Sequence, residues 1–127
     1  MVRSIVLTSA AVVLLSIQGC ATNSSLQEQK TDYGQYSRGS EHPAVLMLFD
    51  QSDDALQAGN WSVALTYLDQ ARRIEPRNPY VLYRQAKAVA AGGDKERARQ
   101  LLERARVYAS AEDEMINYLI YELEFQL

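Results

Sequence analysis

The chain has 127 residues and a mean hydropathy of −0.27, which argues against a protein that crosses a membrane many times. One cysteine excludes an internal disulfide framework, and one histidine, His42, leaves little for a histidine-based metal site. The formal charge of −3 gives no overall attraction to nucleic acid. At this length we expect one folded domain.

The first twenty residues combine one positive charge, at Arg3, with an apolar run from Ile5 to Ile17. Such a run is typical of a secretory signal, and it is shorter than the about 20 residues that a membrane-spanning helix needs. Its end, Ile17-Gln18-Gly19-Cys20, resembles the lipobox of bacterial lipoproteins. The alternatives are an ordinary secreted protein with an unpaired cysteine and a short membrane helix.

The lipobox resemblance implies that residues 1–19 are a cleaved signal peptide and that Cys20 is lipidated, with a diacylglycerol on its sulfur and a third acyl chain on its new amino group. Several acyl chains hold a protein firmly on a membrane, whereas one chain does so only marginally. In this family Ala21, rather than Asp, after the cysteine implies sorting to the outer membrane. The resemblance therefore predicts a lipid-anchored protein that faces the periplasm.

A polar segment follows the cysteine. Residues 21–41 are rich in Ser, Gln, Asn, Thr and Gly and show no helical or strand periodicity. Such a composition cannot bury enough apolar surface to offset its ordering entropy. We expect residues 20–42 to be the lipidated cysteine and a flexible linker with a span of about 25 Å. The folded domain is then residues 43–127.

Two stretches of this domain are similar at a spacing of 34 residues: AGNWSVALTYLDQARRIEP (58–76) and GGDKERARQLLERARVYAS (92–110). The shared residues are Gly59 and Gly93, Ala64 and Ala98, Leu68 and Leu102, and Ala71 and Ala105. This pattern resembles the tetratricopeptide repeat, a helix–turn–helix unit. Lys95 and Ser110 depart from it, where the family has an aromatic residue and a proline.

The resemblance implies an all-α fold, a short solenoid with repeats at about 45–78 and 79–112 and a capping helix at 111–126. The expected helices are 44–58, 61–75, 79–91, 95–109 and 111–126. Glycines 59 and 93 suit tight turns that need a positive φ, and Asn60 and Asp94 suit helix N-caps. Ser110 and Asp113 have the spacing of a capping box for the last helix.

The last helix carries two apolar stripes. Ile116, Leu119, Ile120, Leu123 and Leu127 form the first, which we expect to pack on the second repeat. In tetratricopeptide proteins the first helix of each pair lines a groove that receives peptides. Carried at 34-residue spacing, the resemblance implies a partner-binding groove of Phe49, Asp53, Tyr80, Tyr83, Arg84, Lys87, Tyr118, Tyr121 and Phe125. The aromatic residues would alternatively close a small core or contact a second copy.

Most lysine and arginine residues lie between Arg72 and Arg106, whereas residues 112–124 are acidic and contain no base. The basic stretch is interpreted as a solvated surface with local ion pairs. A contact with anionic lipid or glycan stays open, and an exported protein rarely meets nucleic acid.

Catalytic motifs are absent from the sequence: it has no G-x-S-x-G, H-E-x-x-H, P-loop or C-x-x-C. The acids Asp50, Asp53 and Asp54 are interpreted as a solvated helix face. We expect no enzyme activity, no cofactor, no metal and no nucleic acid.

The sequence predicts an adaptor that binds a protein partner in the cell envelope. Similar lipoproteins include pilotins and adaptors of peptidoglycan enzymes. The alternative is a tethered homo-oligomer that associates through the aromatic stripe of the last helix.

Overall fold

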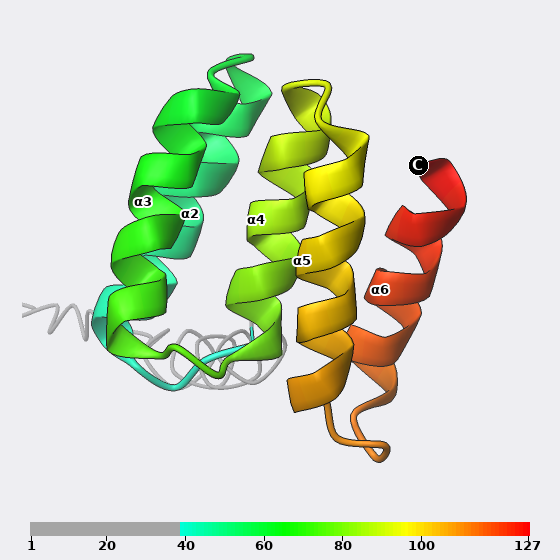
Figure 1. The fold of residues 1–127 in the computed structure, drawn as a ribbon. Helices are drawn as coiled ribbons and strands as arrows, with labels where there is room; N and C mark the ends of the chain where they lie inside the picture. The colour runs from blue at the N-terminus through cyan, green and yellow to red at the C-terminus, as the bar shows by residue number, and fades with distance from the viewer. Residues whose placement is uncertain (1–38) are drawn as a thin grey trace, which may run out of the picture.

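The computed structural model describes residues 39–127, so the predicted signal peptide, Cys20 and the linker up to residue 38 lie outside the described residues. Five α-helices account for the fold of this part: α2 (Pro43–Gln57), α3 (Trp61–Ile74), α4 (Pro79–Ala91), α5 (Lys95–Tyr108) and α6 (Glu114–Gln126). Helices α2 and α3 form one antiparallel pair, α4 and α5 form the next, and α6 closes the row (Figure 1). The prediction of an all-α fold with two helix pairs and a terminal helix is confirmed.

Small residues of the second helices allow the pairs to pack closely. Ala64, Leu68 and Ala71 of α3 are fully buried, as are their counterparts on α5, Ala98, Leu102 and Ala105. The α3 residues pack with α2 and with Val81 and Ala88 of α4. The α5 residues pack with the opposite flank of α4 and with α6. Helix α4 therefore belongs to both core clusters and joins the two repeats.

The turns within both helix pairs contain the glycines that the sequence predicts there. Gly59 and Gly93 adopt φ values of 78° and 93°, a region that glycine enters without steric cost. The Asp94 side chain accepts a hydrogen bond from the backbone N–H of Arg97 at 3.0 Å and so caps α5. Asn60 occupies the predicted N-cap position of α3, but its side chain makes no capping hydrogen bond.

The chain before α2 is tied to the repeats. The amide of Asn78 donates to the carbonyl of Gly39 at 2.7 Å, and the hydroxyl of Ser40 donates to Glu75 at 2.9 Å. Nδ1 of His42 accepts from the backbone N–H of Ala44 and caps α2. Gly39 and Ser40, which the prediction assigned to the flexible linker, therefore contact the loop between α3 and α4.

The loop before α6 is one residue longer than its counterpart before α4. Five residues (109–113) separate α5 from α6, whereas four (75–78) separate α3 from α4. Asp113 caps α6 by accepting from the backbone N–H of Ile116, while the hydroxyl of Ser110 bonds Glu112 within the loop. The predicted start of this helix at 111, with Ser110 as cap, is therefore wrong.

The longer loop sets the register of α6 at 35 residues from α4 instead of 34. Ile116, Ile120 and Leu123 of α6 are buried against the second repeat. They correspond at this spacing to Val81, Gln85 and Ala88, the residues through which α4 contacts the first repeat. One residue corresponds to a rotation of about 100° around a helix axis. Each residue of α6 therefore lies about 100° away from the position that the 34-residue spacing predicts.

Candidate functional site

The first helices of the row form a groove with a volume of about 510 Å³. Its lining residues come from α2 (Asp53, Leu56, Gln57), α4 (Tyr83, Arg84, Lys87) and α6 (Leu119). The structure thus brings together four of the nine residues predicted to bind a partner: Asp53, Tyr83, Arg84 and Lys87. The remaining five lie elsewhere.

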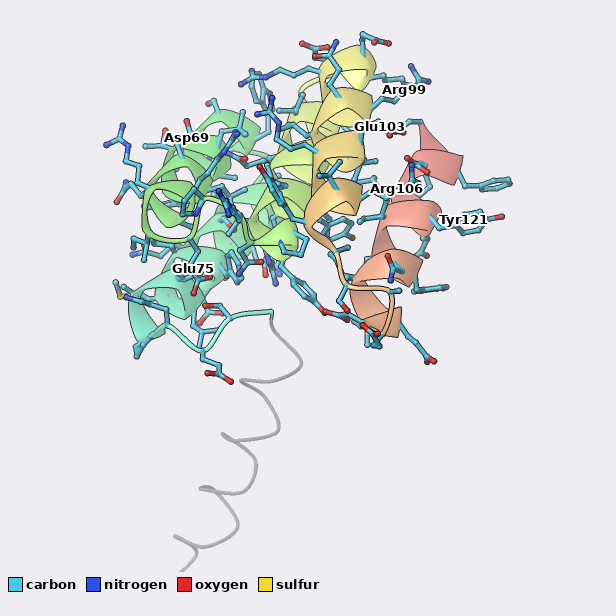
Figure 2. The ribbon with its side chains drawn as sticks, turned by 60° about the horizontal axis from the view of Figure 1, so that its bottom comes forward. Asp69, Glu75, Arg99, Glu103, Arg106 and Tyr121 are labelled. Atoms are coloured by element: carbon cyan, nitrogen blue, oxygen red, sulfur yellow. The ribbon has the colours of Figure 1, made fainter. Side chains whose placement is uncertain are left out.

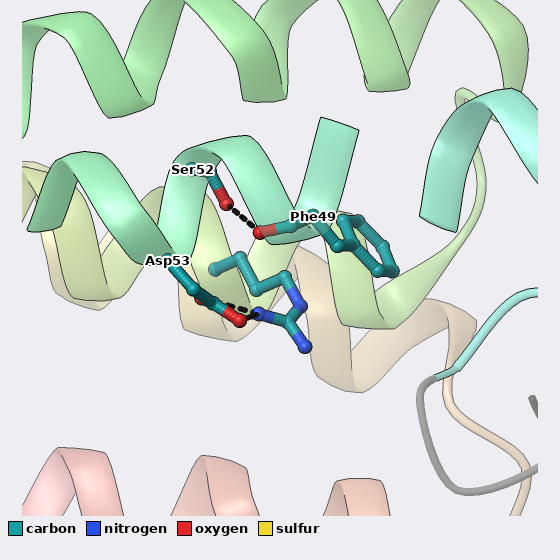
Figure 3. Close-up of polar contacts among 4 residues, drawn as sticks. Phe49, Ser52 and Asp53 are labelled. Carbon is teal, nitrogen blue, oxygen red and sulfur yellow. Dashed lines mark hydrogen bonds and ion pairs between the residues drawn. The ribbon is translucent and has the colours of Figure 1, made fainter. Parts of the chain in front are cut away.

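Arg84 is held at the bottom of this groove. Its Nη1 atom donates to both carboxylate oxygens of Asp53, at 2.6 and 2.7 Å, as Figure 3 shows. Its guanidinium carbon lies 4.4 Å from the centroid of the Phe49 ring. Phe49 is fully buried, so the prediction that it faces a ligand in the groove is wrong. Its ring supports Arg84 from below, an attraction between cation and ring face that fixes the guanidinium.

Tyr83 and Lys87 can each contact a ligand in the groove through a polar group. Burial raises the pKa of the Tyr83 phenol, Arg84 lowers it, and Glu122 and Asp53 raise it. The phenol therefore stays protonated and can donate a hydrogen bond. Lys87 is exposed and has no ion-pair partner among residues 39–127, which leaves its ammonium group open to a carboxylate. Leu56 and Leu119 add apolar surface on either side.

A protein-family model described as Tetratricopeptide repeat matches residues 55–115. The two helix pairs have the fold of tetratricopeptide repeats. The matched range runs from the end of α2 to the start of α6 and includes the whole of the second repeat. No curated protein and no solved structure matches the chain. Tetratricopeptide repeats generally mediate protein–protein interaction, and the groove lies on the first helices, where the family resemblance placed it.

Tyr80 lies outside the groove and joins α4 to the start of α6. Its hydroxyl donates to the carboxylate of Asp113, with O–O distances of 3.0 and 3.1 Å. Gly39 sits against its ring, where a Cβ atom would approach to 2.1 Å. Burial, followed by the bond to Asp113, raises the pKa of Tyr80 to about 12. Its predicted role in partner binding is replaced by a structural one.

The three aromatic residues of α6 form an exposed surface at the end of the repeat row, which we call the terminal surface. Tyr118, Tyr121 and Phe125 are 60%, 66% and 86% exposed. None of them lines the groove, and Figure 2 shows Tyr121 pointing away from the other helices. The prediction that they line the groove is wrong: the 35-residue register turns Tyr121 and Phe125 out of it, and Tyr118, at the position of Tyr83, is not among its lining residues.

The register also shows what the terminal surface corresponds to. Tyr121 and Phe125 occupy the positions of Ala86 and Ala90, which lie on the flank of α4 that packs with α5. The exposed side of α6 therefore corresponds to the side of α4 that packs against α5, the second helix of its repeat. Leu119, at the position of Arg84, faces the groove instead.

Sequence reasoning missed three groove residues. Leu56 and Gln57 follow Asp53 by three and four positions, so helical spacing alone indicates that they share its face. Leu119 was assigned to the stripe that packs on the second repeat, and only the length of the preceding loop shows that it faces the groove.

Proposed function

We propose that this protein is a non-enzymatic adaptor of the bacterial cell envelope, anchored by lipid on Cys20, whose repeat groove binds a segment of a partner protein. The observation that carries the proposal is the groove itself, which helices α2, α4 and α6 form. It contains a phenol, two leucines and a lysine, Lys87, that has no ion-pair partner within residues 39–127. These groups suit a peptide segment in which an acidic side chain, for Lys87, stands beside apolar ones.

The location is proposed from the first twenty residues. The charged start, the short apolar run and Ile17-Gln18-Gly19-Cys20 support a lipidated protein that faces the periplasm from the outer membrane. Within residues 39–127, no helix combines the length and apolar character needed to cross a bilayer. Metabolic labelling with a palmitate analogue should mark the natural chain and not Cys20→Ser, and equal labelling of both would contradict the anchor.

A photocrosslinking residue tests the groove. Placed at Gln57, which lines it, the crosslinker should form an adduct with a partner in living cells, and Lys87→Glu should reduce the yield several-fold. Placed at Gln70, an exposed residue of α3 outside the groove, it is the matched control. The same adduct in equal yield from Gln70, or no effect of Lys87→Glu, would show that the groove is not the binding site.

Self-association through the terminal surface is the second candidate function, and the exposure of Tyr118, Tyr121 and Phe125 favours a protein contact there. Charge favours a different occupant. Helix α6 contains Glu114, Glu122 and Glu124 and no base, and only Glu124 has an ion-pair partner among the described residues, Arg106. Two copies would bring like charges together, whereas a partner helix with Lys or Arg beside its apolar residues would complement them.

Light scattering across a range of protein concentrations shows whether a second copy of the chain or a different protein binds the terminal surface. A dimer that Tyr121→Asp dissociates would establish self-association. A chain that stays monomeric would leave the terminal surface to a different protein.

A further inference from the structure

The second helices of the two repeats enclose a pocket separate from the groove. It has a volume of about 250 Å³ and is lined by Arg72 of α3 and by Arg97, Gln100, Leu101 and Arg104 of α5. No residue is shared with the groove, whose lining comes from α2, α4 and α6. Arg97, Gln100 and Arg104 follow one another by three and four positions, so they share one face of α5.

No carboxylate lines this pocket, and the nearest one in its hydrogen-bond network is Asp69, which accepts from the amide of Gln85 at 2.7 Å. Three of its five lining residues are arginines. Arg97 and Arg104 form no ion pair with any of the residues that the structure describes, and Arg72 contacts only the amide oxygen of Gln85, at 3.4 Å.

Three other arginines of the domain are paired, whereas the exposed Arg73 and Arg77 form no ion pair with residues 39–127 and do not line the pocket. Arg84 binds Asp53, Arg99 binds Glu96, and Arg106 binds both Glu103 and Glu124. The pocket is therefore a local concentration of positive charge in a protein whose net charge is −3.

We infer that this pocket binds a phosphate group. A guanidinium presents its N–H donors in a planar fork that matches the oxygens of phosphate, and several arginines can bind the oxygens of one phosphate together. The amide of Gln100 adds a further donor, and the side chain of Leu101 lines the pocket beside the charged groups. A bound phosphate would offset the positive charge of Arg72, Arg97 and Arg104, none of which forms an ion pair within residues 39–127.

The phosphate can come from two sources, a free phosphorylated compound or the headgroup of an anionic phospholipid. Both offer the same chemistry to the arginines. Binding here neither needs the groove nor depends on a partner protein, so failure of this inference leaves the proposed function intact.

The experiment uses the full chain with Cys20→Ser, which removes the proposed lipid. Its arginine side-chain N–H signals are followed by NMR during titration with inorganic phosphate, with sodium chloride at equal ionic strength as the reference. Phosphate, and not chloride, should shift the signals assigned to Arg72, Arg97 and Arg104. The paired Arg84 and Arg106 should shift little.

A matched pair of variants tests the pocket against simple loss of charge. Arg97→Gln with Arg104→Gln should weaken phosphate binding about tenfold or more, which is about 1.4 kcal/mol. Arg73→Gln with Arg77→Gln removes the same charge from two exposed arginines that do not line the pocket, and should change the affinity less than about twofold. Thermal melting shows whether each variant is folded.

Vesicles distinguish the sources. Flotation with phosphatidylglycerol vesicles, and not with phosphatidylcholine vesicles, that the pocket variant abolishes would assign the site to lipid headgroups. Phosphate binding without flotation would assign it to a free phosphorylated ligand. The inference is overturned if chloride shifts the same signals equally, if neither phosphate nor vesicles bind, or if the control variant loses as much affinity as the pocket variant.

Discussion

The guanidinium of Arg84 on α4 lies against the ring of Phe49 on α2, with 4.4 Å from the guanidinium carbon to the ring centroid. The same group binds Asp53, one turn further along α2. The first helices of the two repeats are thus joined at the base of the groove by one cation, which holds the groove in shape before any ligand arrives.

Removal of this cation should destabilise the domain. We expect Arg84→Ala to lower the free energy of unfolding by about 1–2 kcal/mol, because it removes a half-buried ion pair and a cation–ring contact together. Urea denaturation measures the change. Lys87→Ala, on the next exposed turn of the same helix, is the control and should stay within about 0.5 kcal/mol. An equal loss in both variants would contradict the role of Arg84.

Leu68 should be indispensable to the first repeat. It is fully buried, so Leu68→Ala should lower the free energy of unfolding by about 2–5 kcal/mol, and Leu68→Asp should abolish the cooperative transition by burying a charge. Val107→Asp is the matched control on a residue that is 77% exposed, and its melting curve should be nearly unchanged. Circular dichroism follows all three, and a normal transition in Leu68→Asp would contradict the packing.

The only tryptophan reports on the turn between α4 and α5. A Cβ atom at Gly92 would come within 2.8 Å of the Trp61 ring, which is 41% exposed and so has room to move. Gly92→Ala should therefore shift the fluorescence emission to longer wavelength as the ring becomes more hydrated. At Gly93 a Cβ meets nothing, but φ is 93°, so Gly93→Ala should cost about 1 kcal/mol and leave the emission unchanged. A reversed pattern would refute the contact.

Tyr80 should make stability depend on alkaline pH. Its pKa is raised from 10.0 to about 12 in the folded state, so the folded chain retains a proton that the unfolded chain loses. The contribution is complete below pH 10 and is lost as the pH rises through 12. Tyr80→Phe lacks the titrating group, so the stability difference between the natural chain and the variant should shrink over this range. Denaturation at pH 9, 10 and 11 measures it, and a constant difference would contradict the raised pKa that burial and the bond to Asp113 produce.

The repeats could be predicted from the sequence because each marker residue acts locally. Gly59 and Gly93 are needed by tight turns, and Ala64, Leu68 and Ala71 pack wherever two helices approach closely. These requirements do not depend on the rest of the molecule, so the spacing of the residues was sufficient.

The groove could be predicted only in part. The positions of Asp53, Tyr83, Arg84 and Lys87 follow from the repeat register, which holds between α2 and α4. The placement of Tyr121 and Leu119 depends on the length of the loop before α6. The sequence offers both Ser110 and Asp113 as caps for this helix, and in the structure Asp113 is the cap. Phe49 is buried in the core of the first repeat and contacts Arg84, which is 35 positions away in the sequence, and helical periodicity carries no information on such a contact.

The bond between Asn78 and Gly39 has a mechanical consequence if the chain is held by its proposed anchor. Tension applied from the membrane would reach Gly39 before it reaches α2, and Asn78 and the ring of Tyr80 would carry part of the load directly into α4. Helix α4 also bears Tyr83, Arg84 and Lys87, so a partner that pulls on the groove and the tether that resists it would act on the same helix.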